Sequence, residues 1–272
     1  MVYANLGPVE TTSENALSSM HGDRTRIGGS NPYVLIGTGY ALPDEDEPTR
    51  GRIIVISCSS GGLEGNSRKV RLVTELQVRG GVYSLCQFYN HMVLATVNSK
   101  THVCKLSDDG TGVVRLSFVG IGHHGHILSL FVKSKATRTS DAMSNARKED
   151  EAMMDDSPTK KKPHSDEDNM EQLAIVGDLM RSISLVRYYA EHKALEEIAR
   201  DFNANWTTAI EMLTDDIYLG AENWNHLFVL RRNTKASNEE VRCRLDTIGE
   251  FHLGEMCNKF MCGSLILSLI HI

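Results

Sequence analysis

The feature that most constrains this chain is a succession of short apolar runs, each closed by Gly, Asn, Asp or Ser. Such runs follow one another from Pro32 onward, and no segment carries a long 3.6-residue period. Runs of this length between turn-forming residues predict β-strands rather than helices. The pattern therefore predicts an all-β fold made of small sheets.

A weak internal repeat indicates the size of each sheet. An apolar run, a polar turn residue and a second apolar run recur around Asn98, Asp178 and Glu222, and the last two lie 44 positions apart. Blades of β-propellers repeat every 40 to 50 residues or so. We therefore predict a partial, WD-repeat-like β-propeller of about four blades within residues 32–272. Because an incomplete ring leaves strand edges unpaired, we expect the chain to be a fragment of a larger ring.

Two segments have a composition that disfavours folding. Residues 1–31 are polar and lack periodic apolar positions, and residues 135–171 mix both signs of charge with few aromatic or branched side chains. Both are predicted to be disordered, the second as an insert within the propeller. Within it, Lys160, Lys161 and Lys162 resemble a nuclear-import patch, the alternative being a solvated loop with a chance match.

Charge and targeting signals limit the classes of function. The chain carries 29 Lys and Arg against 35 Asp and Glu, a formal net charge of −6, which disfavours direct binding to nucleic acid. Neither a signal peptide nor an apolar stretch of membrane-spanning length is present in the sequence. We expect a protein of the nucleus and cytoplasm, with no membrane partner and with reduced cysteines.

Signals for catalysis are weak. The run from Gly120 to Gly125 matches GxGxxG, but a second strand follows it where a dinucleotide site needs a helix, so we interpret it as a glycine-rich hairpin. His123, His124 and His126 are close in sequence, yet no carboxylate or Cys has the spacing that would complete a metal site. We predict neither an enzyme nor a cofactor.

A mixture of acidic, basic and aromatic residues favours protein recognition instead. Acidic residues occupy the run Asp44 to Glu47, while Arg181, Arg187 and Arg200 occur in the same region of the chain as Trp206. Surfaces that bind peptides or helices combine such anchors with polar groups. The alternative is that Trp206 and the neighbouring leucines are ordinary core residues of a blade.

Six stretches resemble one known family. They are GRIIVI from Gly51, GVYSLCQF from Gly81, VGDLMRSISLVRYY from Val176, LEEIARDFNANW from Leu195, DDIYLGAEN from Asp215 and FHLGEMCNKF from Phe251. In this order, from Tyr33 to Leu265, they resemble the family of the large subunit of the UV-damaged-DNA-binding complex, within the polyadenylation-factor A subunit superfamily. The alternative is a nucleic-acid-binding propeller from a splicing or polyadenylation factor of that superfamily.

This resemblance implies part of the third propeller of a three-propeller scaffold, the adaptor of a cullin-type ubiquitin ligase in DNA repair. The second propeller, which this chain lacks, would hold the cullin. A pocket between the first and third propellers would receive a helical motif from substrate receptors, namely WD-repeat receptors and the small damaged-DNA-binding subunit, so that damaged DNA is contacted indirectly. By resemblance, the residues that would line this pocket are Glu45, Glu47, Leu128, Leu130, Phe131, Leu179, Arg181, Arg200 and Trp206.

Overall fold

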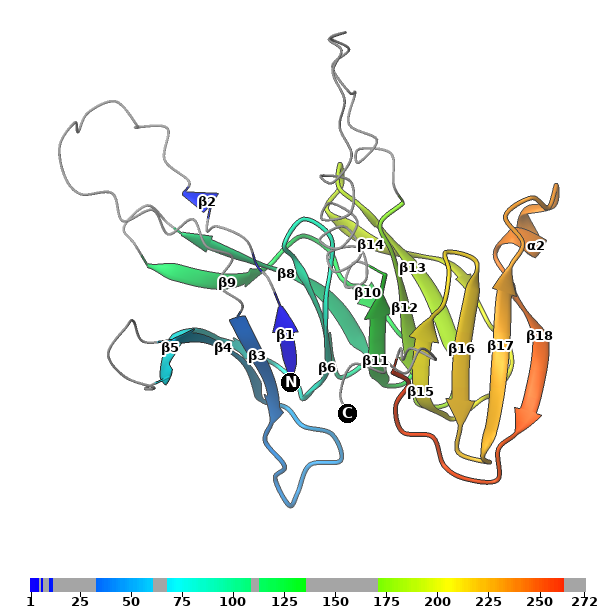
Figure 1. Cartoon of the computed structure of the whole chain (residues 1–272), viewed down its shortest axis with the longest axis horizontal. Helices are drawn as coiled ribbons and strands as arrows, with labels where there is room; N and C mark the ends of the chain where they lie inside the picture. Colours follow the sequence, from blue (N-terminus) through cyan, green and yellow to red (C-terminus); the bar gives the residue numbers. More distant parts are fainter. Residues whose placement is uncertain are drawn as a thin grey trace, which may run out of the picture.

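The computed structural model of this chain describes residues 1–4, 6, 10–11, 33–60, 68–108, 113–135 and 171–261. Within this part the strands form four sheets of four to six strands, nearly all antiparallel, placed side by side along an arc (Figure 1). The four-residue helix α2 (Glu239–Arg242) is a minor addition. The predicted all-β class and partial propeller are confirmed, and each sheet is one blade.

The blades follow one another along the chain. Blade 1 contains β1 (Val2–Ala4), β3 (Tyr33–Gly39), β4 (Gly51–Ser60) and β5 (Arg68–Val78). Blade 2 contains β6 (Val82–Gln87), β7 (Val93–Val97), β8 (Lys100–Asp108) and β9 (Val114–Phe118), with β2 (Glu10–Thr11) and β10 (His123–His124) also paired to β8. Blade 3 contains β11 (Ser129–Ser134), β12 (Leu173–Asp178), β13 (Ile183–Tyr189) and β14 (Ala194–Arg200). Blade 4 contains β15 (Thr207–Met212), β16 (Ile217–Glu222), β17 (His226–Arg232) and β18 (Leu245–His252).

The internal repeat of the sequence corresponds to one position in each blade. Asn98 directly follows β7, Asp178 ends β12 and Glu222 ends β16, so all three lie at the end of the second strand of their blade. Thr38 lies next to the end of β3, the equivalent strand of blade 1. A polar residue is suited to this place because the strand stops there and backbone groups of the turn need partners.

The hydrophobic core lies between neighbouring blades. One cluster joins blades 1 and 2, around Leu35 and Val93, and a second joins blades 2 and 3, around Phe88 and Val176. The third joins blades 3 and 4 around Leu185, Tyr218 and other side chains. The alternating apolar residues of each strand therefore pack against the next blade, so each blade stabilises its neighbour.

The beginning of the chain differs from its prediction. Val2–Ala4 forms β1, which pairs with β3, and Ala4 and Leu6 are buried in the same cluster as Leu35. The expectation of disorder is wrong for these residues, because a three-residue strand gives no periodic signal and gains its burial only from β3. Most of residues 1–31, almost all of the insert, and Lys160, Lys161 and Lys162 within it lie outside the described residues.

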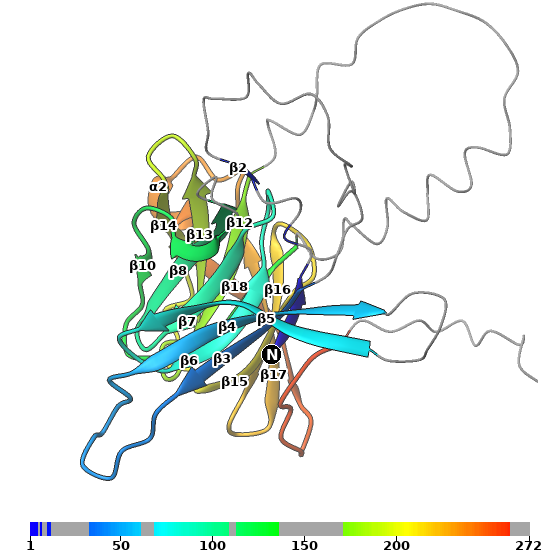
Figure 2. The ribbon, with the colours of Figure 1, turned by 90° about the vertical axis from the view of Figure 1, so that its left-hand side faces the viewer.

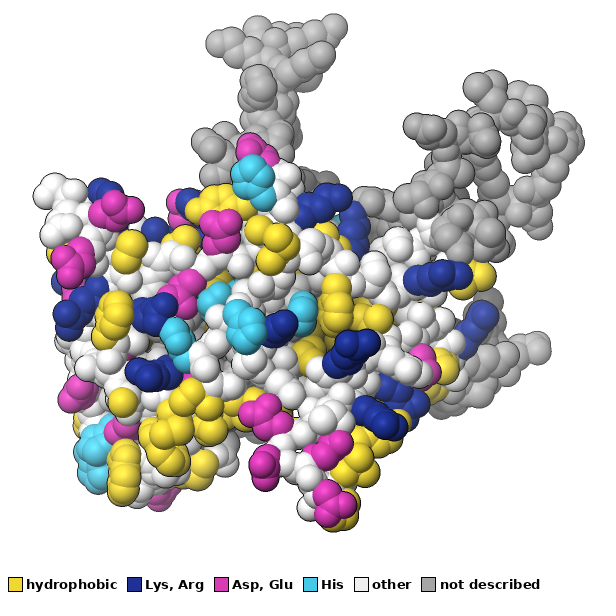
Figure 3. All heavy atoms as spheres, turned by 180° about the vertical axis from the view of Figure 1, so that it is seen from behind, with side chains coloured by type: hydrophobic (Ala, Val, Ile, Leu, Met, Phe, Trp, Pro, Cys, Tyr) yellow, Lys and Arg dark blue, Asp and Glu magenta, His cyan; other side chains and the backbone are white. Residues whose placement is uncertain are grey.

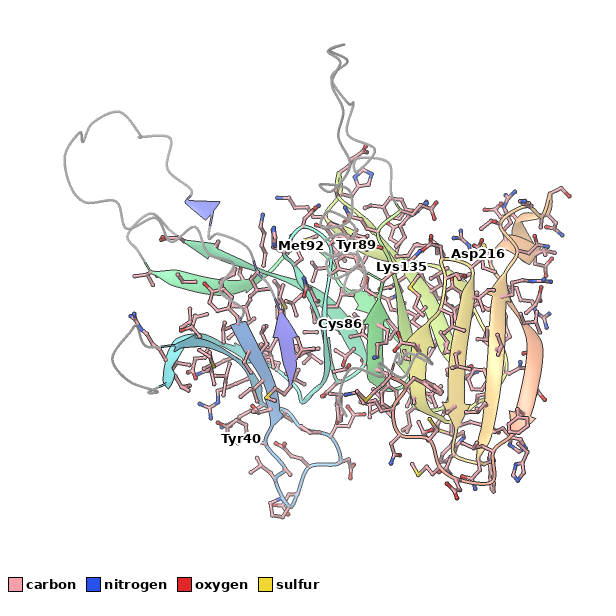
Figure 4. All side chains as sticks on the ribbon, in the orientation of Figure 1. Tyr40, Cys86, Tyr89, Met92, Lys135 and Asp216 are labelled. Carbon is pink, nitrogen blue, oxygen red and sulfur yellow. The ribbon has the colours of Figure 1, made fainter. Side chains whose placement is uncertain are left out.

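Labelled side chains and strands help to locate the two ends of the molecule. Figure 4 shows Tyr40 at the lower end of the molecule, and Tyr89, Met92 and Lys135 toward the upper end. Figure 2 looks onto blade 1, where the β4–β5 pair extends beyond the other blades. Among the described residues no helix is long and apolar enough to cross a membrane.

Candidate docking surface

Loops from all four blades are linked at the lower end of the molecule, and we call this surface the loop face. It comprises residues 44–48, 98–99, 127–128, 179–182, 202–206, 223–225 and 253–257. A series of hydrogen bonds crosses it from blade 1 to blade 4. The bonds are Asn98 Nδ2 to Pro48 O (3.0 Å), Ser129 N to Asn98 O (2.9 Å), Leu179 N to Leu128 O (2.9 Å), Ser182 N to Asn205 O (3.1 Å), Asn223 N to Trp206 O (3.0 Å) and Leu253 N to Asn225 O (2.8 Å).

The acidic loop between β3 and β4 forms one end of the loop face. Tyr40 N donates to Arg50 O at 2.9 Å and closes the base of this loop. The Glu45 carboxylate accepts hydrogen bonds from the backbone N (3.2 Å) and the hydroxyl (2.7 Å) of Thr49, while the exposed Glu47 lies 3.4 Å from Asn98 Nδ2. Both predicted glutamates therefore help to fix the shape of the loop.

Asp178 organises the centre of the loop face. Its Oδ2 accepts from Ile127 N at 2.8 Å and from Leu128 N at 3.1 Å, and its Oδ1 accepts from Met180 N and Arg181 N, both at 3.1 Å. This buried carboxylate thus holds two segments at once, one before blade 3 and one within it. Bonds from N–H groups to a carboxylate are among the stronger hydrogen bonds of proteins.

Asp201 plays a similar part between blades 3 and 4. Its Oδ2 accepts from the Ser182 hydroxyl at 2.6 Å and from Asn205 Nδ2 at 3.4 Å, and its Oδ1 accepts from Asn203 N at 3.1 Å. Burial raises the pKa of Asp201, and the hydrogen bonds from Ser182 and Asn203 partly offset that rise. Asp201 therefore fixes the loop that leads to Trp206.

Four of the predicted pocket residues lie on neighbouring loops of this surface. Leu128 and Leu179 are half-buried and share a backbone hydrogen bond, Arg181 is exposed beside Asp178, and Trp206 begins the approach to β15. Trp206 is 44% exposed, so the alternative that it is an ordinary core residue does not hold. The Arg181 side chain makes no hydrogen bond or ion pair within the described part of the chain.

The other predicted residues have different surroundings. Phe131 on β11 is half-buried and packs against the cluster between blades 3 and 4, so it belongs to the core that supports the loop face. Leu130 is half-buried at a β-bulge opposite β12, where pairing shifts between Ser129 and Phe131. A bulge changes the direction in which a side chain points. Whether these two side chains contact a partner remains a prediction.

Arg200 belongs to an ion-pair network beside the loop face. Its Nε lies 2.6 Å from Glu197 Oε1, and its guanidinium lies over the Phe202 ring, 5.6 Å from the centroid. The Nε2 atoms of His123 and His126 lie 3.6 and 3.9 Å from Glu197 Oε2. Burial lowers the pKa of His123, and Glu197 acts in the opposite direction.

In this network the Glu197 carboxylate lies beside the two histidines, although it is distant from them in the sequence. Within the described residues, however, no group of three His, Cys, Asp or Glu side chains is arranged to hold a metal ion. The glycine-rich run is also explained by packing. A Cβ at Gly120, which has φ of +66°, would collide with the Lys193 carbonyl oxygen. The hairpin prediction is wrong here, because the run connects β9 of blade 2 with β11 of blade 3.

Sequence reasoning missed several residues of the loop face. Asp178 was expected only as a turn residue, and Asp201 was not singled out. Exposed apolar side chains also occur at the lower ends of blades 3 and 4, and Figure 3 shows hydrophobic side chains gathered there. They are Phe202, Trp224, Phe251, Leu253 and Met256. A tryptophan in a two-strand turn, as in Glu222-Asn-Trp224-Asn225, was the signal available for Trp224.

Comparison with known proteins agrees with this architecture. The family described as CPSF A subunit region matches residues 8–146 and 163–269. DNA damage-binding protein 1 of Solanum lycopersicum is 40% identical over 240 residues, which cover 88% of this chain and 18% of the relative. DNA damage-binding protein 1a of Arabidopsis thaliana is 40% identical over 241 residues with the same coverage, and the Oryza sativa protein is 38% identical over 242 residues.

The chain thus spans about a fifth of the length of these relatives. The matched family covers both sides of the insert and includes every blade. With the four-blade fold and the ordered sequence match, the chain belongs to the CPSF A subunit family and, within it, to the DNA damage-binding protein 1 group.

Proposed function

We propose that this chain is a non-enzymatic protein-docking module that acts in the response to damaged DNA. The observation that carries the proposal is the loop face, where loops of four blades hold half-buried leucines, exposed tryptophans and Arg181, which has no partner among the described residues. Partners bind best to fixed surfaces with aromatic and arginine anchors. The link to DNA damage comes from the names of the relatives.

The partners we propose are substrate receptors of a cullin-type ubiquitin ligase, for which the chain would form part of the adaptor in the nucleus. A receptor's helix would place its apolar side against Leu128, Leu179 and Trp206. The Arg181 guanidinium would meet a carboxylate or the carbonyl end of that helix. Contact with the cullin would require other parts of the longer protein, because this chain covers 18% of its relatives.

The test is binding of the small damaged-DNA-binding subunit to the purified chain, compared with an Arg181→Glu/Trp206→Ala double variant. Trp and Arg anchors contribute about 2 kcal/mol or more each, so the double variant should lose about 4 kcal/mol and bind roughly 1,000-fold more weakly. Asp178 and the blade cores are untouched, so circular dichroism and Tm should stay close to wild type. Equal binding by both proteins would exclude the loop face as the docking surface.

A second function, direct binding of nucleic acid, is suggested by the relatives' name. The net charge of −6 and the acidic loop oppose it, because they repel phosphate. Filter binding with UV-irradiated and intact duplex DNA would separate the two functions. Direct binding predicts measurable affinity that falls steeply as salt rises. The docking function predicts negligible binding until a DNA-binding partner is added.

A further inference from the structure

The two tryptophans of the whole chain both lie on the loop face. Trp206 is 44% exposed and Trp224 is 69% exposed, and the bond from Asn223 N to Trp206 O brings their loops together. Leu253 is 44% exposed and its N–H donates to Asn225 O, so it continues the same surface. We call Trp206, Trp224 and Leu253 the tryptophan patch.

The opposite end of the loop face has the opposite character. The acidic loop carries Asp44, Glu45, Asp46 and Glu47 in succession. Glu45 accepts hydrogen bonds from Thr49, whereas Asp44 and Asp46 are exposed and make no hydrogen bond or ion pair within the described residues. Figure 3 shows acidic side chains and the hydrophobic group along the same lower edge of the molecule. The loop face therefore has two different ends, one negatively charged and the other made of exposed aromatic and aliphatic side chains.

We propose that the loop face binds an amphipathic polypeptide segment in one orientation, with its basic end over the acidic loop and its aromatic or aliphatic side chains over the tryptophan patch. The inference rests on the proposed docking function and adds two points to it. The surface extends beyond the predicted pocket to Trp224 and Leu253. The charge of the acidic loop decides which way the partner lies.

Physical reasoning supports both points. Large exposed apolar side chains on neighbouring loops mark interaction sites, and tryptophan is among the residues most enriched at binding hot spots. A run of exposed acidic residues attracts a cationic segment and repels an anionic one, so it selects orientation more than it adds affinity. A segment bound the other way would place basic groups on the tryptophan patch and leave the acidic loop without counter-charges.

The chain provides its own optical probe for the test. In the Trp224→Phe variant the fluorescence reports Trp206 alone, and in the Trp206→Phe variant it reports Trp224 alone, because no other tryptophan is present. The ligand is a synthetic amphipathic helical peptide with Leu and Phe in one half and Lys in the other. A second peptide of the same composition has its Lys residues spread evenly along the helix.

We expect the Lys-ended peptide to shift the emission of both single-tryptophan variants to shorter wavelength and to bind about tenfold more tightly than the evenly charged peptide at low salt. Trp224→Ala should weaken binding at least about tenfold. Asp44→Lys/Asp46→Lys should remove the preference between the two peptides. The control Glu191→Lys/Asp216→Lys makes the same change of charge outside the loop face, on the β13–β14 and β15–β16 turns, and should keep that preference.

The outcomes separate this inference from the proposed function. A shift for Trp206 without one for Trp224 would overturn the extension of the surface and leave docking at the predicted pocket intact. Equal affinity for the two peptides, or a preference that survives Asp44→Lys/Asp46→Lys, would overturn the orientation. If neither tryptophan responds, and the Arg181→Glu/Trp206→Ala variant still binds the receptor subunit, both proposals fail.

Discussion

Replacing Asp178 tests how the loop face is held together. The carboxylate accepts four backbone N–H groups, two from Ile127 and Leu128 and two from Met180 and Arg181. All four bonds are partly buried, but Ile127 and Arg181 are exposed residues, so in Asp178→Ala their amides can find water. The amides of the half-buried Leu128 and Met180 lose their acceptor without such a substitute. Hydrogen bonds to a charged group contribute about 1.5 to 3 kcal/mol each, so we expect a loss of about 3 to 6 kcal/mol.

The measurement is the free energy of unfolding in urea, read from curves with an unchanged m-value. Asp178→Asn keeps one acceptor oxygen and should lose about half as much. The control is Asp246→Ala, a half-buried residue whose side chain, 44% exposed, lies 3.5 Å from Arg244 Nε, and it should change stability by less than about 0.5 kcal/mol. Hydrogen exchange should also become faster first at residues 127–128 and 180–181. A loss below about 1 kcal/mol for Asp178→Ala would refute the role given to this carboxylate.

Three further predictions follow from single sites. Burial lowers the pKa of His123 below its unfolded value of about 6.5, so its contribution to stability is complete above that pH and is lost as the pH falls toward the folded pKa; His123→Gln should flatten this decline in urea titrations. Gly120→Ala should lower the free energy of unfolding by about 2 kcal/mol or more, and the Tm with it, since its Cβ would collide with Lys193 O at positive φ. An unchanged Tm would contradict the geometry. Burial raises the pKa of the Cys104 thiol to about 12, so native-state alkylation read by mass spectrometry should modify the exposed Cys58 and spare Cys104.

The strands and their grouping were predictable because their determinants are local. Apolar runs bounded by turn residues define β12, β13 and β16 directly, and the polar residues Asp178 and Glu222 mark equivalent strand ends. The short β1 was missed, since three residues carry no periodicity and depend on pairing with β3 for their burial. The resemblance identified Trp206 and Arg181, but it did not show that Asp178 and Asp201 hold their loops.

The sequence by itself determined the fold class, the spacing of the blades and the chemical kinds of residue available for docking, because periodicity and turn preference act over a few neighbouring positions. Only the tertiary structure decided which of these residues meet. Glu197 of β14 lies beside His123 and His126, a backbone hydrogen bond joins the loops of Trp206 and Trp224, and Phe131 packs against the core. Such contacts depend on how the sheets twist and pack together, and residues far apart in sequence carry no local record of that arrangement.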